Sequence, residues 1–246
     1  NYLRSFGNHD ITLFAGFEQY TNNYNEFSAS RENYISTLIQ ILDVGPDLNK
    51  TNSGYETIYA RKSWIGRATY AYKSKYLAEF LLRRDGSLKF PPKSRWGNFP
   101  GFLLGWRASE EDFWKDNLSF INYFKLKASY GEMGMDPGDP FQYMDKFKLG
   151  NIIGMTFGTG GEIETTAGPP AIANANITWE TQITKNLGFE SQFLNGLLFL
   201  NFDYFYNIRN NILAKRNGSV PDFTGLTLPD ENMARVDNHG VEIEGG

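Results

Sequence analysis

Apolar and polar side chains alternate along long stretches of the chain, whereas helical periodicity hardly occurs. The first clear run sets one apolar series against a more polar one: Ile11, Leu13, Ala15 and Phe17 against Thr12, Phe14, Gly16 and Glu18. Successive side chains of a strand point to opposite faces, so each such run predicts a strand with one apolar face.

Two short turns join alternating runs. The polar segment Lys73-Ser74-Lys75 predicts one hairpin, and the Asn195-Gly196 pair predicts another, since both residues readily adopt the backbone of a tight turn. The pattern predicts an all-β, antiparallel, up-and-down fold of about eight strands. These strands are expected at residues 11–18, 61–73, 76–83, 100–107, 122–131, 186–193, 198–207 and 236–244.

The predicted connections alternate in length. Short ones lie at 74, 109–121 and 195–196, and long ones, rich in Gly, Pro, Asn and Asp, lie at 19–60, 84–97, 132–176 and 208–235. Short turns on one side and long loops on the other are typical of a transmembrane outer-membrane β-barrel, with the long loops outside the cell. Residues 109–112 predict a capped helical turn, and residues 35–42 predict a short helix.

Aromatic residues make up 16% of the chain and gather near the predicted strand ends. Tyr and Trp favour the boundary between membrane and water, so such clusters predict the aromatic girdles of a barrel. Ordinary packing in a soluble core is the alternative. The residues concerned are Tyr70, Tyr72, Tyr76, Trp106, Tyr204 and Tyr206.

Charge and chemistry exclude several classes of function. The net charge of −4 gives no basic field for nucleic acid, and the absence of Cys excludes disulfides and thiolate metal sites in this chain. His9 and His239 are far apart in sequence, so no catalytic site is expected. No cofactor is expected either. Loop calcium at Asp43 with Asp47, or at residues 136–139, is a weaker reading than simple turn formation.

An ordered set of short motifs resembles the barrel signature of SusC/RagA-type TonB-linked outer-membrane receptors. Leu88 and His239 depart from it, standing where a small polar residue and a basic residue are expected. The matching positions are Arg83, Arg84, Asp85, Gly86, Ser87, Arg95, Trp96, Gly97, Gly105, Trp106, Arg107, Trp179, Glu180, Gly240 and Glu242.

The resemblance implies that residues 1–246 are part of a barrel domain of about 22 strands, without its plug domain, TonB box and C-terminal strands. The chain starts without Met and stops after an alternating Val-Glu-Ile-Glu run, which also suggests a fragment. Such a receptor is not an enzyme. It imports glycans, oligosaccharides or peptides across a Bacteroidetes-type outer membrane, and its partners are membrane lipid, its own plug, the TonB complex and a SusD-like lipoprotein.

Two groups of candidate residues follow. Polar strand positions are expected to face the lumen, where they pair with the plug or contact substrate: Arg67, Glu79, Arg83, Lys125, Lys127, Glu190 and Asp203. Loop aromatics are expected either to contact substrate or a partner protein, or to pack the loops together: Tyr20, Tyr24, Tyr34, Tyr55, Tyr59, Phe141, Tyr143 and Phe157.

The segment 83–87 has two readings. Its charges line the lumen mouth or contact plug or lid, or they are turn chemistry that fixes the base of a loop. For the whole chain two rival functions remain open: a soluble secreted β-sandwich that binds carbohydrate, and a passive porin or autotransporter barrel.

Overall fold

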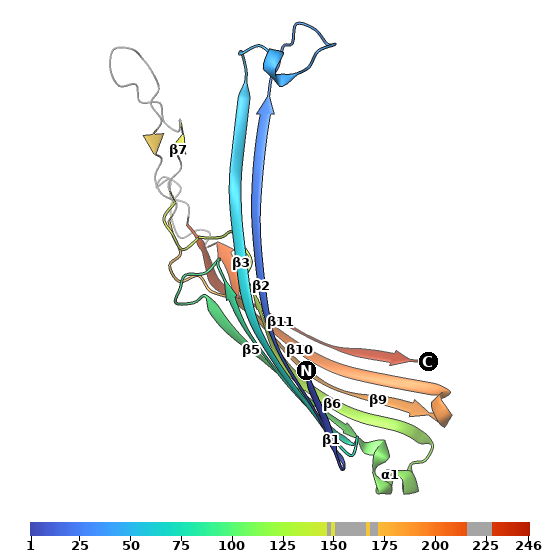
Figure 1. Cartoon of the computed structure of the whole chain (residues 1–246). Helices are drawn as coiled ribbons and strands as arrows, with labels where there is room; N and C mark the ends of the chain where they lie inside the picture. The colour runs from blue at the N-terminus through green and yellow to red at the C-terminus, as the bar shows by residue number, and fades with distance from the viewer. Residues whose placement is uncertain (147–148, 151–165, 168–171, 216–227) are drawn as a thin grey trace. The chain divides into compact units, whose positions relative to one another are not determined.

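A computed structural model describes the chain except for residues 147–148, 151–165, 168–171 and 216–227. In the described part, nine strands form one sheet in the order β1-β2-β3-β4-β5-β6-β9-β10-β11 (Figure 1). Neighbours in the sheet follow the order of the chain, which confirms the up-and-down prediction.

The strands of this sheet are β1 Tyr2–Phe6, β2 His9–Ser30, β3 Thr51–Tyr72, β4 Tyr76–Ser87, β5 Trp96–Arg107, β6 Ile121–Met135, β9 Glu180–Phe193, β10 Leu198–Lys215 and β11 Asp230–Gly245. Two short strands, β7 Leu149–Gly150 and β8 Thr166–Ala167, form a separate pair. The helical segments are η1 Leu42–Val44, η2 Ala108–Glu110, α1 Asp112–Asn117 and η3 Leu194–Gly196.

The predicted turns are present. Lys73 and Ser74 have φ values of 51° and 55°, and Lys75 N donates to Tyr72 O at 2.9 Å. At the second hairpin Asn195 and Gly196 have φ values of 58° and 84°. The helical turn expected at 109–112 is present as η2 and α1, but no side-chain cap bonds either segment.

Several predicted boundaries are wrong because the strands extend further than the alternation does. The loops predicted at 19–60, 84–97 and 208–235 shrink to 31–50, 88–95 and 216–229. The loop predicted at 132–176 lies at 136–179, is about as long as predicted and contains β7 and β8. A hairpin of β1 and β2 around Gly7 also escaped prediction. Beyond the apolar region both faces of a strand meet water, so the main-chain ladder continues without any hydrophobic alternation to reveal it.

The chain divides into two compact units, Gln19–Arg61 and the remainder. In the smaller unit, the ends of β2 and β3 are joined by the tip 31–50. Arg31 Nη1 donates to Asp47 Oδ1 at 2.6 Å and to Pro46 O at 2.9 Å, and its hydrogen bond lowers the pKa of Asp47. The short helix predicted at 35–42 is wrong. Only the 3-10 turn η1 forms, because exposed apolar residues such as Leu38, 92% exposed, offer no packing that would stabilise a helix this short.

The larger unit has an unusually small buried core. Its cluster consists of Phe90, Phe99, Ile177 and Trp179, and the rings of Phe90 and Phe99 lie 5.1 and 5.4 Å from that of Trp179. Elsewhere large apolar side chains remain exposed, as Leu104 at 60% and Leu187 at 61% show. In the part of the chain that the structure describes, most apolar surface of the sheet is therefore not covered by protein.

The Phe99 ring lies against Gly134 of β6, where a Cβ atom would be 1.9 Å from Phe99 Cζ. Gly134→Ala is therefore expected to displace this ring from the cluster and to lower the free energy of unfolding by about 1–3 kcal/mol. Heat-dependent unfolding of the full-length protein in detergent measures the effect. Gly131→Ala in the same strand is the matched control, because a Cβ there meets no atom within 4 Å. Equal stability of the two variants would contradict this packing.

Candidate functional site

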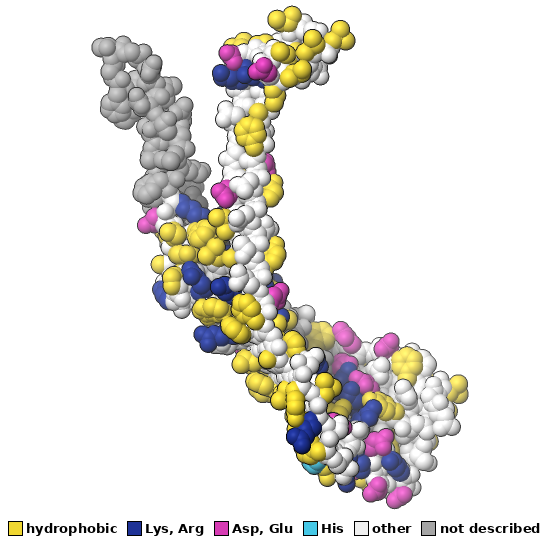
Figure 2. Space-filling view, viewed as in Figure 1, with side chains coloured by type: hydrophobic (Ala, Val, Ile, Leu, Met, Phe, Trp, Pro, Cys, Tyr) yellow, Lys and Arg dark blue, Asp and Glu magenta, His cyan; other side chains and the backbone are white. Residues whose placement is uncertain are grey.

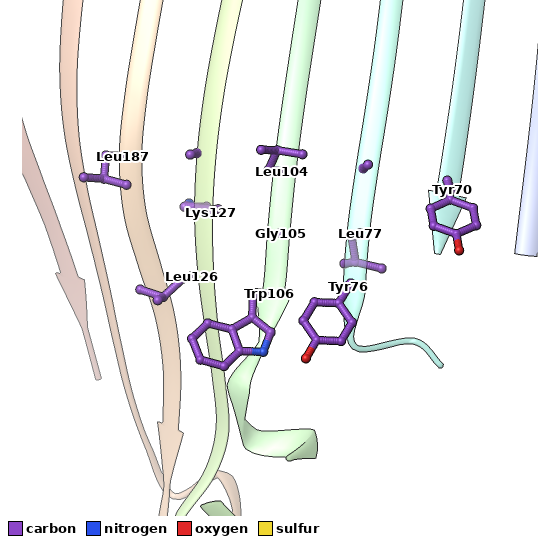
Figure 3. Close-up of a pocket in the computed structure, with 11 residues that line it drawn as sticks. Tyr70, Tyr76, Leu77, Leu104, Gly105, Trp106, Leu126, Lys127 and Leu187 are labelled. Atoms are coloured by element: carbon purple, nitrogen blue, oxygen red, sulfur yellow. The ribbon is translucent and has the colours of Figure 1, made fainter. Parts of the chain in front are cut away.

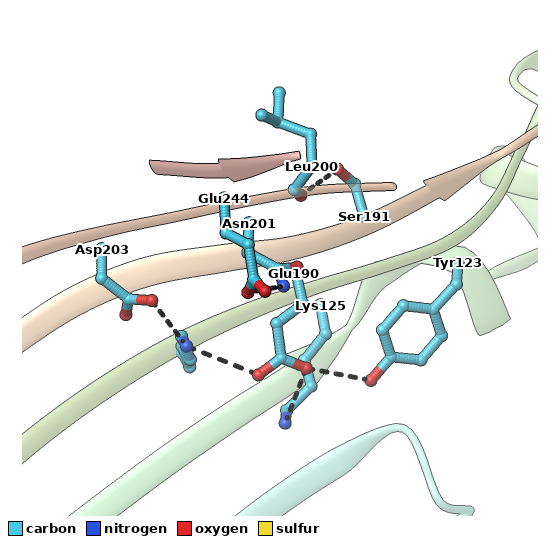
Figure 4. A network of polar contacts seen from close by, with 9 residues as sticks. Tyr123, Lys125, Glu190, Ser191, Leu200, Asn201, Asp203 and Glu244 are labelled. Carbon is cyan, nitrogen blue, oxygen red and sulfur yellow. Dashed lines mark hydrogen bonds and ion pairs between the residues drawn. The ribbon is translucent and has the colours of Figure 1, made fainter. Parts of the chain in front are cut away.

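One face of the sheet carries a network of ion pairs (Figure 4). Lys125 Nζ lies 3.3 Å from Glu190 Oε2, and Lys127 Nζ lies 3.5 Å from Glu190 Oε1 and 2.9 Å from Asp203 Oδ2. Strand register explains the arrangement, since Lys125 pairs with Glu190 across β6 and β9. Figure 2 shows basic and acidic side chains intermixed over the ends of these strands.

The contact of Lys127 with Asp203 joins two strands that are not neighbours. It crosses β9 at Gly188, which is opposite Lys127 in β6 and opposite Asp203 in β10. A Cβ at position 188 would lie 2.4 Å from Asp203 Oδ1. The absence of a side chain at Gly188 is thus what allows the carboxylate to fold over β9 toward the lysine.

The remaining predicted polar positions also form ion pairs. Arg67 Nη2 lies 2.6 Å from Glu79 Oε2, and Arg83 Nη2 lies 3.3 Å from Asp85 Oδ1. In the strand register, Glu79 of β4 is opposite Leu103 of β5. Gly105, two residues further along β5 and therefore on the same face, is opposite Lys127 of β6. The structure therefore brings the seven polar positions to one face of the sheet, in pairs of opposite sign. Each partly exposed pair contributes only about 0–1 kcal/mol to stability, so the network stabilises the sheet itself only weakly.

The motif residues at 83–87 stabilise the base of a loop. Ser87 is fully buried, and its Oγ donates to Asp136 Oδ2 at 2.6 Å. Lys89 Nζ donates to Asp136 O at 2.9 Å. Gly86 leaves room for the Trp96 ring, over which the Arg84 guanidinium lies at 5.5 Å. These contacts favour the reading of this segment as the base of a loop.

The other motif positions are architectural as well. Trp179 Nε1 donates to Arg95 O at 3.2 Å, while the buried Glu180 accepts bonds from Arg209 Nε at 3.1 Å and Leu213 N at 2.8 Å. Gly97 makes room for the Phe99 ring and Gly240 for the Phe205 ring, and a Cβ at position 105 would lie 3.4 Å from the Leu77 side chain. Arg107 lies over the Tyr123 ring at 5.6 Å, and Glu242 is opposite Asp203 in register. Sequence reasoning gave Asp136 only a turn or calcium role and missed Arg209, because the partners of both residues are distant in sequence.

The loop aromatics do not form one cluster. In the smaller unit, Tyr20 pairs with Tyr59 at 5.8 Å and Tyr24 with Tyr55 at 5.6 Å, and all four rings share one face of the hairpin. Tyr34 packs instead at the tip, against Gly45. In the larger unit Phe141 lies 6.3 Å from Tyr143, which packs on the buried cluster. Phe157 lies outside the described residues.

A carboxylate organises the turn end of the larger unit. Glu111 accepts hydrogen bonds from Tyr76 Oη at 2.6 Å, Lys75 Nζ at 3.0 Å and Trp106 Nε1 at 3.3 Å. These donors, Tyr76 first, lower the pKa of Glu111 to about 2. Glu111 thereby ties the 73–75 turn to the helical connection that follows β5, which explains why this residue does not cap α1.

Among the described residues, no group of three or more His, Cys, Asp or Glu side chains is arranged to hold a metal ion. The helices in the same part of the chain are all too short or too polar to cross a membrane.

The low pKa of Glu111 predicts a pH dependence. Because the folded-state pKa lies below the usual value of 4.5, the charged carboxylate stabilises the fold fully above about pH 4.5, and this contribution is lost as the pH falls toward about 2. The unfolding temperature of the full-length protein should decline over this range, and Glu111→Gln should remove that part of the decline. Glu110→Gln, next to it and paired with the exposed Lys115, is the control. An identical decline in both variants would refute the assignment.

Comparison with known proteins places these features in context. Residues 1–246 match the family model described as TonB dependent receptor-like, beta-barrel. TonB-dependent receptor P39 of Formosa agariphila is 32% identical over 248 residues, covering 99% of this chain and 22% of that protein. TonB-dependent receptor SusC of Bacteroides thetaiotaomicron is 28% identical over 251 residues, covering 98% and 23%.

Solved structures show the same fold. One chain of the RagAB peptide importer in its closed-closed state matches with a TM-score of 0.86 at 20% identity, covering 99% of this chain and 26% of that one. The RagAB peptide transporter matches with a TM-score of 0.87. The present chain thus spans about a quarter of the length of its relatives.

Proposed function

Because the chain belongs to the TonB dependent receptor-like β-barrel family, we propose that it forms part of the wall of an outer-membrane importer driven through TonB. The relatives found are receptors rather than enzymes. The cargo that we propose is a glycan, an oligosaccharide or a peptide. The rest of the receptor would supply the plug and the TonB box, and a SusD-like surface lipoprotein would cover the extracellular side.

The observation that carries this proposal is the contrast between the two faces of the sheet. One register row runs Tyr76, Trp106, Leu126, Phe189, Phe202 and Ile243. The side chains of Leu126 and Ile243 are exposed there, and a soluble sandwich would bury such a row under a second layer. An uncovered apolar face on strands of this length instead suits contact with lipid.

The ion-paired face suits contact with a plug domain. Lys125, Lys127, Glu190 and Asp203 alternate in sign and are only partly exposed, so they offer both donors and acceptors to a folded polar partner. A plug held by such a mixed surface releases at a modest cost, because each exposed pair is weak. This is what a wall needs if its plug must rearrange during transport.

The aromatic face of the smaller unit is our candidate for cargo contact. Its two tyrosine pairs alternate along β2 and β3 with polar positions such as Asn22 and Thr57. Flat rings flanked by hydroxyl and amide groups suit both sugar faces and peptide backbones. The phenol of Tyr24 donates to Glu26 Oε2 at 2.7 Å, which raises the pKa of this phenol and keeps it protonated.

Energy dependence separates the proposed importer from a passive porin. In cells that express the full-length receptor, uptake of its oligosaccharide or oligopeptide cargo should stop when TonB is deleted. A porin would continue to admit the same compounds by diffusion. Uptake that persists at an unchanged rate without TonB would therefore overturn the proposal.

The cargo face is tested by the double variant Tyr55→Ala/Tyr59→Ala in the full-length receptor. Loss of two stacking rings should weaken cargo binding at least fivefold, since aromatic contacts of this kind are worth about 0.5–1.5 kcal/mol each beyond their buried area. Isothermal titration with the cognate cargo measures the change. Phe27→Ala is the control, because Phe27 is an exposed aromatic in the same hairpin but on the alternate face. Equal losses in both would contradict a specific cargo face.

A further inference from the structure

A depression of about 420 Å³ lies in the apolar face of the larger unit (Figure 3). Its shape follows from the sizes of residues in one register row, where Ala78, Leu104, Ala128 and Leu187 succeed one another across four strands. The two alanines form a low floor, and the leucines stand beside it. We refer to this depression, lined also by Tyr76 and Trp106, as the outer trough.

The outer trough is continued by a second depression. This one shares Tyr70, Ala78 and Leu104 with the first and extends to Phe80 and Phe102. From the row of Tyr76 to the row of Phe80 the strand advances four residues, which corresponds to about 14 Å. Barrel strands are tilted by about 35–45°, so this length covers about 10–11 Å of depth, most of the roughly 15 Å of one leaflet.

Polar groups gather at the turn end of the trough. Tyr72 stacks near Tyr76 with ring centroids 6.4 Å apart, and Lys73 Nζ lies 5.6 Å from the Tyr72 ring. His9 Nδ1 lies 2.8 Å from Tyr70 Oη, and its ring is 4.9 Å from that of Tyr72. A cation, an imidazole and phenol groups are therefore concentrated where the apolar lining ends.

Lys73 offers an available positive charge at this end. The neighbouring Lys75 is neutralised by Glu111 at 3.0 Å, whereas no ion pair of Lys73 occurs among the residues that the structure describes. A lysine beside an aromatic cluster at the edge of an apolar surface matches an anionic headgroup at the membrane boundary.

From this arrangement we propose that the outer trough binds one glycerophospholipid of the periplasmic leaflet. One acyl chain lies over Ala78 and Ala128, and the phosphate lies beside Lys73. The proposal depends on the membrane setting of the family but not on transport or its cargo. The trough would give the receptor a specific lipid contact in addition to the general one made by its remaining apolar face.

The test uses the full-length receptor, stripped of lipid in detergent and titrated with palmitoyl-oleoyl phosphatidylglycerol under native mass spectrometry. The wild type should retain one lipid. Ala78→Leu/Ala128→Leu fills the floor and should weaken retention at least tenfold, because it displaces several methylenes of the chain. Lys73→Asn should weaken it several-fold, and asparagine tolerates the positive φ of this position.

Ala15→Leu is the control, because Ala15 is an exposed alanine that shares the face of Ile11 and Leu13 but does not line the trough. Diacylglycerol with the same chains should bind more weakly than the phospholipid. Retention unchanged in the double alanine variant, or equal binding of diacylglycerol, would overturn the proposal.

A second measurement does not depend on assembly of the alanine and lysine variants. Phosphatidylglycerol with a brominated chain should quench Trp106, which lines the trough. The Trp106 contribution is taken as the difference between wild type and Trp106→Phe. Quenching that saturates at one lipid per receptor supports the site, and quenching that rises linearly with lipid would overturn it.

Discussion

Each strand of the large sheet has to suit a different surrounding on each of its two faces, because neighbouring side chains point in opposite directions. Two consecutive residues show the constraint: Lys125 belongs to the ion-paired row on one face, and Leu126 belongs to the apolar row on the other. A slip of one residue in register would exchange the two faces entirely. The hydrophobic pattern of every strand is therefore also what sets its pairing with the next.

Glycines relieve this constraint where two layers of side chains must approach closely. Gly188 lets the Asp203 carboxylate cross β9, and Gly134 receives the ring of Phe99. At both positions a side chain from the neighbouring strand lies over the backbone of the strand that carries the glycine. The described part of the sheet thus holds together mainly through main-chain pairing, with one small aromatic core and a few glycine-permitted contacts as additional ties.

Prediction from sequence succeeded where the two faces of a strand differ. The sharing of one face by the polar positions, the turns at 73–75 and 195–196 and the family were all recognisable from alternation, turn chemistry and ordered motifs. Prediction failed for β2 after residue 18 and for β3 before residue 61. Residues there, such as Asn22 and Asn23, meet water on both faces of the strand, so apolar and polar side chains do not alternate. The partners of Asp136 and Trp179 were also out of reach, because Ser87 and Arg95 are separated from them by 49 and 84 residues.

The most direct test of the account is cysteine labelling of the full-length receptor in native outer-membrane vesicles, helped by the absence of Cys from this chain. Single cysteines at Leu104, Phe189 and Phe202 should react with lipid-soluble maleimides and resist charged ones. Cysteines at Lys125 and Glu190 should resist the lipid-soluble reagents. The opposite assignment, with the first three labelled from water and the last two from lipid, would contradict the division of the sheet into a lipid face and a polar face.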